Sequence, residues 1–292
     1  MNHQHSPEPD EHLNLDACGL ETLPETVARL VHLRTLSLFN NALRTLPEAV
    51  WELSHLITLN LGQNHFVSIP EQVGRLARLQ MLDLGHNQLI TLPDSLGSLS
   101  SLTFLYASNN RLTGLPGTLR SCRNLVYLNV TDNRLTDVPE WLGDLRGLKE
   151  LRLYNNQISH LPASLSGLTG LRELHAMNNR LVELPESIGQ LQALKKLDLQ
   201  GNGLISLPQS IGQLSELTDL NLRYNQLSTL PESFSELGNL RFLDLRANQL
   251  TSLPEGLGSL PHLEKLDLRW NRLATLTKFA ARLQARGCLV YA

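Results

Sequence analysis

Acidic side chains that could serve acid–base chemistry recur along this chain at a fixed spacing. Asp83, Asp198, Asp244 and Asp267 occupy the same place within a segment that repeats every 23 residues. General acid–base catalysis requires groups positioned on a single reacting centre, whereas these carboxylates follow the spacing of the repeat. We therefore predict that the protein is not an enzyme and that it has no catalytic residues and no cofactor-binding residues.

Histidines suggest two metal sites, and we predict that neither is used. His65 and His86 lie in adjacent repeats, but two histidines without a third ligand are usually surface residues. The Met1 amine, the backbone amides of Asn2 and His3 and the His3 imidazole could give Cu(II) four nitrogens in a plane. A solvated tail is the simpler interpretation. The sequence also contains no GxxxxGK, CxxC or HExxH motif.

Composition and charge limit the classes of partner. The formal net charge is -3 and the isoelectric point about 6.4, which lacks the positive excess expected of a nucleic-acid-binding protein. No apolar run reaches the length of about 18 residues that a membrane span needs, and residues 1–12 lack a secretory signal pattern. We therefore expect a cytoplasmic monomer that binds neither nucleic acid nor membranes. The alternative is a secreted effector without a cleaved signal.

Two columns of residues recur without interruption through most of the chain. Successive members of each column are separated by 23 residues, with no insertion. Two columns in register over so many copies predict one elongated repeat domain. The asparagine column comprises Asn41, Asn64, Asn87, Asn110, Asn133, Asn156, Asn179, Asn202, Asn225, Asn248 and Asn271. The proline column comprises Pro24, Pro47, Pro70, Pro93, Pro116, Pro139, Pro162, Pro185, Pro208, Pro231 and Pro254.

The residues of each copy predict its local structure. Leucines at the fourth and sixth positions alternate with polar residues, which is typical of a short strand with one buried face. The return half of each copy has the dozen or so residues that a parallel connection needs. Its proline blocks further strand pairing and leaves room only for a 3₁₀-like turn. The predicted fold is an α/β solenoid, curved like a horseshoe, with a parallel β-sheet on the concave face and short 3₁₀ or helical turns and loops on the convex face.

The asparagines lie where the chain leaves each strand and turns. A buried carboxamide can both donate and accept hydrogen bonds there, and an unpaired group would cost roughly 1 to 3 kcal/mol. We therefore predict a structural role for the asparagine column.

One copy shows a family pattern in full. The sequence LxxLxLxxNxL is formed by Leu217, Leu220, Leu222, Asn225 and Leu227. The chain resembles leucine-rich repeat proteins, in particular the 23-residue LPxxhxxL intracellular type of Ras-group repeat scaffolds and some bacterial repeat proteins. This resemblance implies a non-enzymatic protein–protein interaction scaffold that binds a partner on its concave face, and it suggests a role in intracellular signalling. The alternative is a bacterial effector or host-interacting protein that uses the same face.

Both ends of the chain depart from the repeat pattern. We expect residues 1–9 to form a disordered tail, residues 10–276 twelve repeats of 23 residues, and residues 277–292 a capping helix and strand. Thr277 is the predicted N-cap of that helix, and Gly287 is its predicted end. These ends lead us to expect a complete array. The cysteines are expected to be buried free thiols; they are Cys18, Cys122 and Cys288.

Side chains that point out of the sheet form the predicted binding surface. They occupy positions three, five and seven of each copy, and neighbouring copies stand about 4.8 Å apart. Exposed aromatic residues interleaved with arginine are typical of binding hot spots, although aromatic residues also favour strands for packing alone. The predicted partner-binding residues of the middle copies are Met81, Phe104, Tyr106, Tyr127, Arg152, Tyr154, His175 and Met177.

The later copies carry a ladder of charges whose signs nearly cancel. One interpretation is a self-compensating ion network of Asp and Arg side chains. The other is a binding site for an acidic partner, and the sequence leaves both open. We include four ladder residues among the predicted partner-binding residues: Arg223, Arg246, Arg269 and the neighbouring Trp270.

Overall fold

The computed structural model describes residues 11–274 and 277–292. The chain divides into two compact units, residues 1–125 (unit 1) and residues 126–292 (unit 2). The predicted tail and the possible copper site at Met1, Asn2 and His3 lie outside the described residues. The boundaries expected for the tail, the array and the cap stay predictions.

The described part of unit 1 is a stack of repeats, each with a short strand and a 3₁₀ turn. The strands pair in parallel, so that Leu36 lies opposite Leu59 of the next repeat. The strands are β1 (His12–Asn14), β2 (Thr35–Ser37), β3 (Thr58–Asn60), β4 (Met81–Asp83) and β5 (Phe104–Tyr106). The 3₁₀ turns are η1 (Glu25–Arg29), η2 (Glu48–Glu52), η3 (Glu71–Arg75), η4 (Asp94–Ser98) and η5 (Gly117–Ser121).

Unit 2 continues the same alternation and adds one α-helix. Its strands are β6 (Tyr127–Asn129), β7 (Glu150–Arg152), β8 (Glu173–His175), β9 (Lys196–Asp198), β10 (Asp219–Asn221), β11 (Phe242–Asp244), β12 (Lys265–Asp267) and β13 (Leu289–Tyr291). Its 3₁₀ turns are η6 (Glu140–Asp144), η7 (Ala163–Gly167), η8 (Glu186–Gln190), η9 (Gln209–Gln213), η10 (Glu232–Glu236) and η11 (Glu255–Ser259). The α-helix is α1 (Thr277–Gln284).

Alternation of apolar and polar residues gives each strand a buried and an open face. In β4, Leu82 is fully buried, while Met81 and Asp83 are half-buried on the opposite face. Leucines of successive copies stack between the sheet and the 3₁₀ turns, and each buried side chain contributes roughly 1.5 to 3 kcal/mol. The hydrophobic core is therefore a set of repeated rows.

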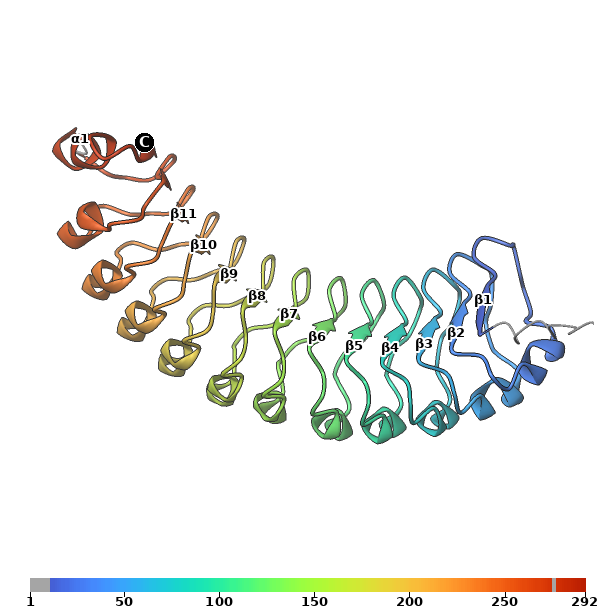
Figure 1. Cartoon of the computed structure of the whole chain (residues 1–292). Helices are drawn as coiled ribbons and strands as arrows, with labels where there is room; N and C mark the ends of the chain where they lie inside the picture. The colour runs from blue at the N-terminus through green and yellow to red at the C-terminus, as the bar shows by residue number, and fades with distance from the viewer. Residues whose placement is uncertain (1–10, 275–276) are drawn as a thin grey trace, which may run out of the picture. The chain divides into compact units, whose positions relative to one another are not determined.

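Each 3₁₀ turn follows directly after a member of the proline column. Pro70, for example, has an extended backbone with φ -73° and ψ 158°, and its carbonyl accepts a hydrogen bond of 3.1 Å from the N–H of Val73. Proline lacks an N–H, so it ends the extended segment without leaving a donor unpaired. In Figure 1 the strands of unit 2 lie along the inner side of a curved stack, with the 3₁₀ turns along its outer side. This arrangement confirms the predicted solenoid.

Glycine is required where the 3₁₀ turns of neighbouring repeats touch. A Cβ atom on Gly143 would lie 2.0 Å from the carbonyl oxygen of Ser164 in the next repeat, and one on Gly189 would lie 2.4 Å from that of Ser210. Both distances are far inside van der Waals contact. Close stacking of the turns therefore depends on the missing side chain at this position.

Side chains of the asparagine column tie each repeat to its neighbour. Asn156 Nδ2 donates to the carbonyl oxygen of Val130 in the preceding repeat at 3.0 Å and to that of Leu153 at 2.9 Å. Its Oδ1 accepts a hydrogen bond of 3.0 Å from the N–H of Leu135. Asn64 makes the corresponding bonds in unit 1. The predicted structural role of the asparagines is confirmed.

One cysteine departs from the expectation. Cys122 and Cys288 are buried, but Cys18 is exposed, so the prediction of a buried thiol is wrong for Cys18. It takes the asparagine place in the first copy, and no described repeat precedes β1 to cover it. The Cys18 thiol donates to the carbonyl oxygen of Asp16 in its own repeat, at 3.5 Å. An asparagine of the column also donates to a carbonyl oxygen of the preceding repeat.

Helix α1 begins at Thr277, the predicted N-cap residue. It ends shortly before Gly287, whose φ of +87° is the left-handed conformation that favours glycine at a helix end. The N–H of Cys288 then donates to the carbonyl oxygen of Leu283 at 3.1 Å, which leads the chain into β13. Among the described residues, no helix combines the length and the apolar character required to cross a membrane.

Candidate partner-binding face

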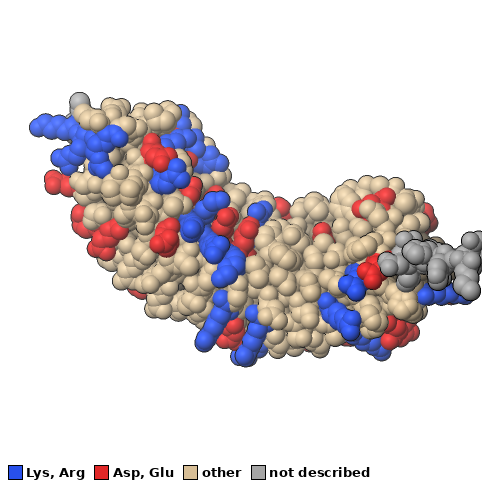
Figure 2. Space-filling view, in the orientation of Figure 1, with Lys and Arg blue, Asp and Glu red and all other residues tan. Residues whose placement is uncertain are grey.

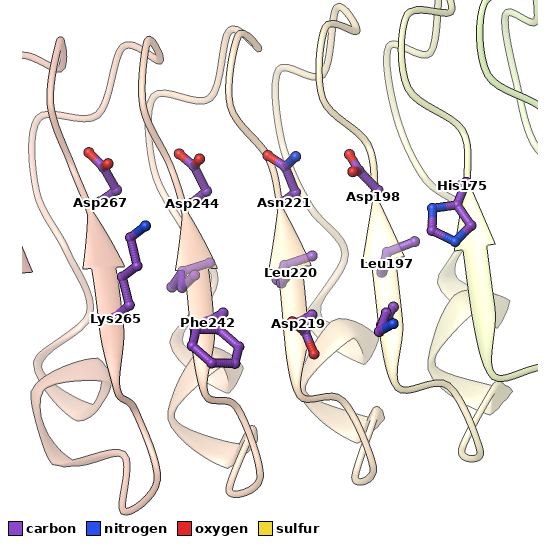
Figure 3. Close-up of a pocket in the computed structure, with 12 residues that line it drawn as sticks. His175, Leu197, Asp198, Asp219, Leu220, Asn221, Phe242, Asp244, Lys265 and Asp267 are labelled. Atoms are coloured by element: carbon purple, nitrogen blue, oxygen red, sulfur yellow. The ribbon is translucent and has the colours of Figure 1, made fainter. Parts of the chain in front are cut away.

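A hollow of about 370 Å³ lies on the sheet face of unit 2, over strands β8 to β12. Its volume is near the lower end of the range for ligand sites, roughly 300 to 1,000 Å³, which suits one or two side chains of a partner. Figure 3 shows its lining residues in two rows. The row at position three contains Lys196, Asp219, Phe242 and Lys265, and the row at position five contains His175, Asp198, Asn221, Asp244 and Asp267.

The hollow forms because β10 presents short side chains between longer ones. Asp219 pairs in register with Lys196 on β9 and with Phe242 on β11. Neighbouring strands are only about 4.8 Å apart, so these two longer side chains wall the space above Asp219. Phe242 is 36% exposed, so the rim of the hollow includes an open aromatic ring.

Position five also stabilises the end of a strand where it is aspartate or asparagine. Asp198 Oδ1 accepts a hydrogen bond of 3.1 Å from the N–H of Gln200, and Asn221 Oδ1 accepts one of 3.3 Å from the N–H of Arg223. Aspartate and asparagine make the same side-chain-to-backbone turn. From the sequence, these aspartates were considered for acid–base chemistry and for an ion network, and this bond to the backbone was missed.

Two of the carboxylates are neutralised by arginines at position seven. Arg246 Nη2 lies 2.5 Å from Asp244 Oδ2, and Arg246 Nε lies 3.3 Å from Asp267 Oδ2. Arg269 Nη2 lies 2.6 Å from the same oxygen of Asp267. Burial acts to raise the pKa of Asp267, but the hydrogen bonds and charges of the two arginines lower it overall. Figure 2 shows such positive and negative side chains intermixed over the C-terminal part of the chain. Here the ladder is a self-compensating network.

The other two carboxylates of the hollow are held by uncharged donors. Burial raises the pKa of Asp198, and the N–H of Gln200 is the largest of the influences that oppose this rise. Asp219 Oδ2 accepts a hydrogen bond of 2.6 Å from the hydroxyl of Thr218. Among the residues that the structure describes, neither carboxylate forms an ion pair.

Cations around the hollow have other partners. Lys196 Nζ lies 3.2 Å from Glu173 Oε1, and Lys265 Nζ lies 5.7 Å from the centre of the Tyr291 ring. Arg223 Nε donates to Gln200 Oε1 at 2.6 Å. Positive charge is therefore held at the margins of the hollow, while two carboxylates face its middle.

One side-chain group within the described residues has the composition of a metal site. The ligand atoms of Glu150, Glu173 and His175 lie within 4.8 Å of one another. Both carboxylates are already engaged, Glu150 with Arg152 Nε at 2.5 Å and Glu173 with Lys196. His175 Nε2 lies 3.1 Å from Glu173 Oε2. The cations in contact with these carboxylates compete with any metal ion.

The predicted residues of unit 1 lie together on its sheet face. Met81 on β4 pairs in register with Phe104 on β5, and Tyr106 lies opposite Asp83. Phe104 is 38% exposed, and the other two predicted side chains are half-buried. A single patch that also includes Tyr127 and later residues would span both units, and it stays a prediction.

The predicted residues of unit 2 fall in two places. Tyr127, Arg152, Tyr154, His175 and Met177 are half-buried on or directly after β6 to β8. Arg152 lies over the Tyr127 ring at 5.7 Å and opposite His175 on the next strand. The second group consists of the ladder residues Arg223, Arg246, Arg269 and Trp270.

The ladder ends in an arginine that lies close to two aromatic rings. Trp270 is 64% exposed, and the Arg269 guanidinium lies 5.9 Å from its ring and 5.2 Å from that of Tyr291. Sequence reasoning did not single out Tyr291, nor did it single out Phe242 or Gln200. A signal existed for Phe242 and Gln200, because they occupy the same third and seventh positions as residues that were predicted.

A family model described as leucine rich repeat matches residues 11–66, 54–112, 116–181, 192–250 and 231–273. The chain belongs to the leucine-rich repeat family. The matched segments cover most of the strands and turns described above, so the predicted resemblance is confirmed. A comparison with curated proteins found no match.

Several solved structures share this repeat architecture. A leucine-rich repeat protein of Leptospira interrogans is 35% identical with a TM-score of 0.92, and the match covers 97% of this chain and 72% of that chain. The leucine-rich repeat ectodomain of an Arabidopsis thaliana membrane receptor kinase, solved in complex with Casparian strip integrity factor 2, is 34% identical with a TM-score of 0.72. That match covers 86% of this chain and 34% of the receptor chain. An internalin of Listeria monocytogenes is 24% identical with a TM-score of 0.79, covering 96% of this chain and 86% of that chain, and it supports the fold alone.

Proposed function

We propose that this protein is a non-enzymatic scaffold that binds another protein through the sheet face of unit 2. The leucine-rich repeat is in general a protein-binding fold without catalysis. The Arabidopsis thaliana receptor ectodomain was solved with a bound factor, which supports a protein or peptide partner for this chain too.

Large exposed side chains on this face carry the proposal. Phe242, Tyr224 and Trp270 are 36%, 50% and 64% exposed. Tyr224 and Trp270 also have φ values of 56° and 61°, a left-handed conformation that costs a non-glycine residue about 1 to 2 kcal/mol. Asparagine or glycine would suit these positions better, as Asn178 and Gly201 do in other copies. Each of these rings lies 5.1 to 5.9 Å from the guanidinium of the arginine that precedes it in the sequence. Exposed aromatic side chains next to arginine are typical of binding hot spots.

Co-precipitation with a face variant tests this proposal. The Phe242→Ala/Trp270→Ala variant is expected to lose proteins that the wild-type chain retains from a lysate of the source cells. Ile205→Ala provides the control, because Ile205 is 55% exposed and does not line the hollow. Retention of the same proteins by both variants and the wild type would contradict the proposal.

The cellular setting is a further part of the proposal. We infer a cytoplasmic scaffold in intracellular signalling, which cell fractionation tests directly. A second candidate is a bacterial effector or host-interacting protein, and the 35% identity to a Leptospira interrogans protein favours it. Export of a reporter by the first twelve residues would support this second candidate, and a reporter that stays in the cytoplasm would count against it.

A further inference from the structure

We propose that the hollow over β8 to β12 receives an arginine or lysine side chain of the partner protein between Asp198 and Asp219. This inference rests on the proposed function of the same face. It names the chemistry of the group that enters the hollow.

The pairing of charges around the hollow supports a basic side chain. Asp244 and Asp267 are bound by arginines, and Lys196 is bound by Glu173. Asp198 and Asp219 remain, on adjacent strands. Their hydrogen-bond donors are uncharged, and the nearby Arg223 and Arg241 act on them through charge alone. A carboxylate whose hydrogen bonds come only from neutral groups gains a stronger hydrogen bond when a cationic donor approaches it. The middle of the hollow therefore attracts positive charge.

The wall of the hollow suits the apolar stem of such a side chain. Phe242 stands next to Asp219 in register on β11, and its ring is 36% exposed. Lysine and arginine bury their methylene stems along apolar surfaces while the charged group stays among polar partners. The Arg241 guanidinium lies over this ring, 5.1 Å from its centre, so the ring already accepts one cation–π contact, and the part of the ring that stays exposed is what an incoming side chain can reach.

Cations at the margins limit what can flank this side chain. Arg223, at position seven, bonds the side chain of Gln200 at one margin of the hollow. Lys265, on β12, lies near the Tyr291 ring at the other margin. Both can donate hydrogen bonds to main-chain carbonyls or to acidic residues of a partner. The structure therefore favours a partner segment with one basic residue between neutral or acidic neighbours over a uniformly basic segment.

An acidic group in the hollow is disfavoured for the same reason. Arg246 and Arg269, for which the sequence left both an acidic partner and an internal ion network open, already bind Asp244 and Asp267. An incoming carboxylate would have to displace those aspartates and would also meet the negative charge of Asp198 and Asp219.

Selection of peptides on the full chain tests the inference. Random dodecapeptides displayed on phage are selected against the purified protein, and the recovered sequences are synthesised. The expected peptides contain an arginine or lysine whose replacement by citrulline or norleucine weakens binding on the order of tenfold. Asp198→Asn/Asp219→Asn is expected to weaken binding equally. Combining the two changes is expected to add little further loss, because both remove the same interaction.

A matched control separates this charge effect from general effects of the substitutions. Asparagine occupies position five naturally at Asn60 and Asn221, where it makes the same bond to the backbone, so Asp198→Asn is expected to fold. Asp83 occupies position five in unit 1 and accepts a hydrogen bond of 2.8 Å from the N–H of Gly85. Asp83→Asn is expected to leave peptide binding unchanged.

Three outcomes would overturn the inference. Peptides that require Phe242 but tolerate citrulline and the Asp198→Asn/Asp219→Asn variant would contradict it while leaving the proposed function intact. A selection that yields only sequences without arginine or lysine would also contradict it. Peptides that tolerate the Phe242 and aspartate substitutions alike would count against both the inference and the proposed function.

Discussion

The sheet faces of units 1 and 2 differ in charge, although both stand on the same framework. In unit 1, positions five and seven carry mainly small or uncharged residues, such as Ser37, Asn60, Gly62, Gly85 and Ser108. In unit 2, the same positions carry Asp198, Arg223, Asp244, Arg246, Asp267 and Arg269. The bonds of Asn64 in unit 1 and of Asn156 in unit 2 are nevertheless alike. The comparison teaches that the same framework carries different outward residues in the two units, and the proposed partner binding rests on that difference.

The largest loss of stability is expected when an asparagine of the column is replaced, because these side chains join neighbouring repeats of the framework. Asn156→Ala would leave the N–H of Leu135 unpaired inside the stack. It would also remove the bonds to the carbonyl oxygens of Val130 and Leu153, which keep one bond each from Asn133 and Asn179. We expect a loss of about 3 to 5 kcal/mol in the free energy of unfolding, since an unpaired buried group costs roughly 1 to 3 kcal/mol and each lost hydrogen bond about 0.5 to 1.5 kcal/mol. Urea unfolding measures this. Asn239→Ala is the control, because Asn239 is exposed and bonds the carbonyl oxygen of Ser215 at 2.8 Å; a similar loss for both variants would contradict the role of the column.

A smaller loss is expected at the stacked 3₁₀ turns. Gly143→Ala places a Cβ atom against the carbonyl oxygen of Ser164, and overpacking of this kind costs about 1 to 3 kcal/mol. A Cβ atom on Gly238 would lie 4.0 Å from its nearest neighbour, the carbonyl oxygen of Glu236, so Gly238→Ala is expected to change stability by less than about 1 kcal/mol. Equal midpoints of thermal unfolding for the two variants would show that the turns can move apart at no cost.

The smallest effect concerns a half-buried carboxylate at position five, which occurs in both units. Burial raises the pKa of Asp198 in unit 2 and of Asp83 in unit 1. A raised pKa in the folded state means that the ionised carboxylate disfavours folding above that pKa, and this cost disappears as the pH falls below the unfolded value. Asp198→Asn and Asp83→Asn are therefore each expected to raise the urea midpoint slightly at pH 7 and to leave it unchanged near pH 3. A lower midpoint at pH 7 would indicate that the carboxylates are stabilising.

The framework could be predicted from the sequence because each of its determinants is local and repeats. Alternating leucines, the proline before each turn and the asparagine after each strand act within one copy or between neighbours. Cys18 shows the limit of this reasoning, because the same position is buried only when another repeat covers it.

The hollow could not be predicted in the same way. Arg223 and Arg246 occupy the same position in adjacent copies, yet Arg223 bonds Gln200 and Arg246 bonds two aspartates. Such differences depend on side-chain conformations and on the length of the neighbouring side chain. The residues of the charged ladder were identified from the sequence, but their pairing required the structure.

In our account, the repeated framework determines stability while the outward residues of unit 2 bind the partner. A combined variant of the unit 2 face tests this division of roles most directly. The substitutions are Asp198→Asn, Asp219→Asn, Phe242→Ala and Trp270→Ala, and the measurements are urea unfolding and binding of a peptide selected on the wild-type chain. We predict a free energy of unfolding within about 1 kcal/mol of the wild-type value, together with loss of peptide binding. A loss of stability as large as that expected for Asn156→Ala, or peptide binding that persists, would contradict the account.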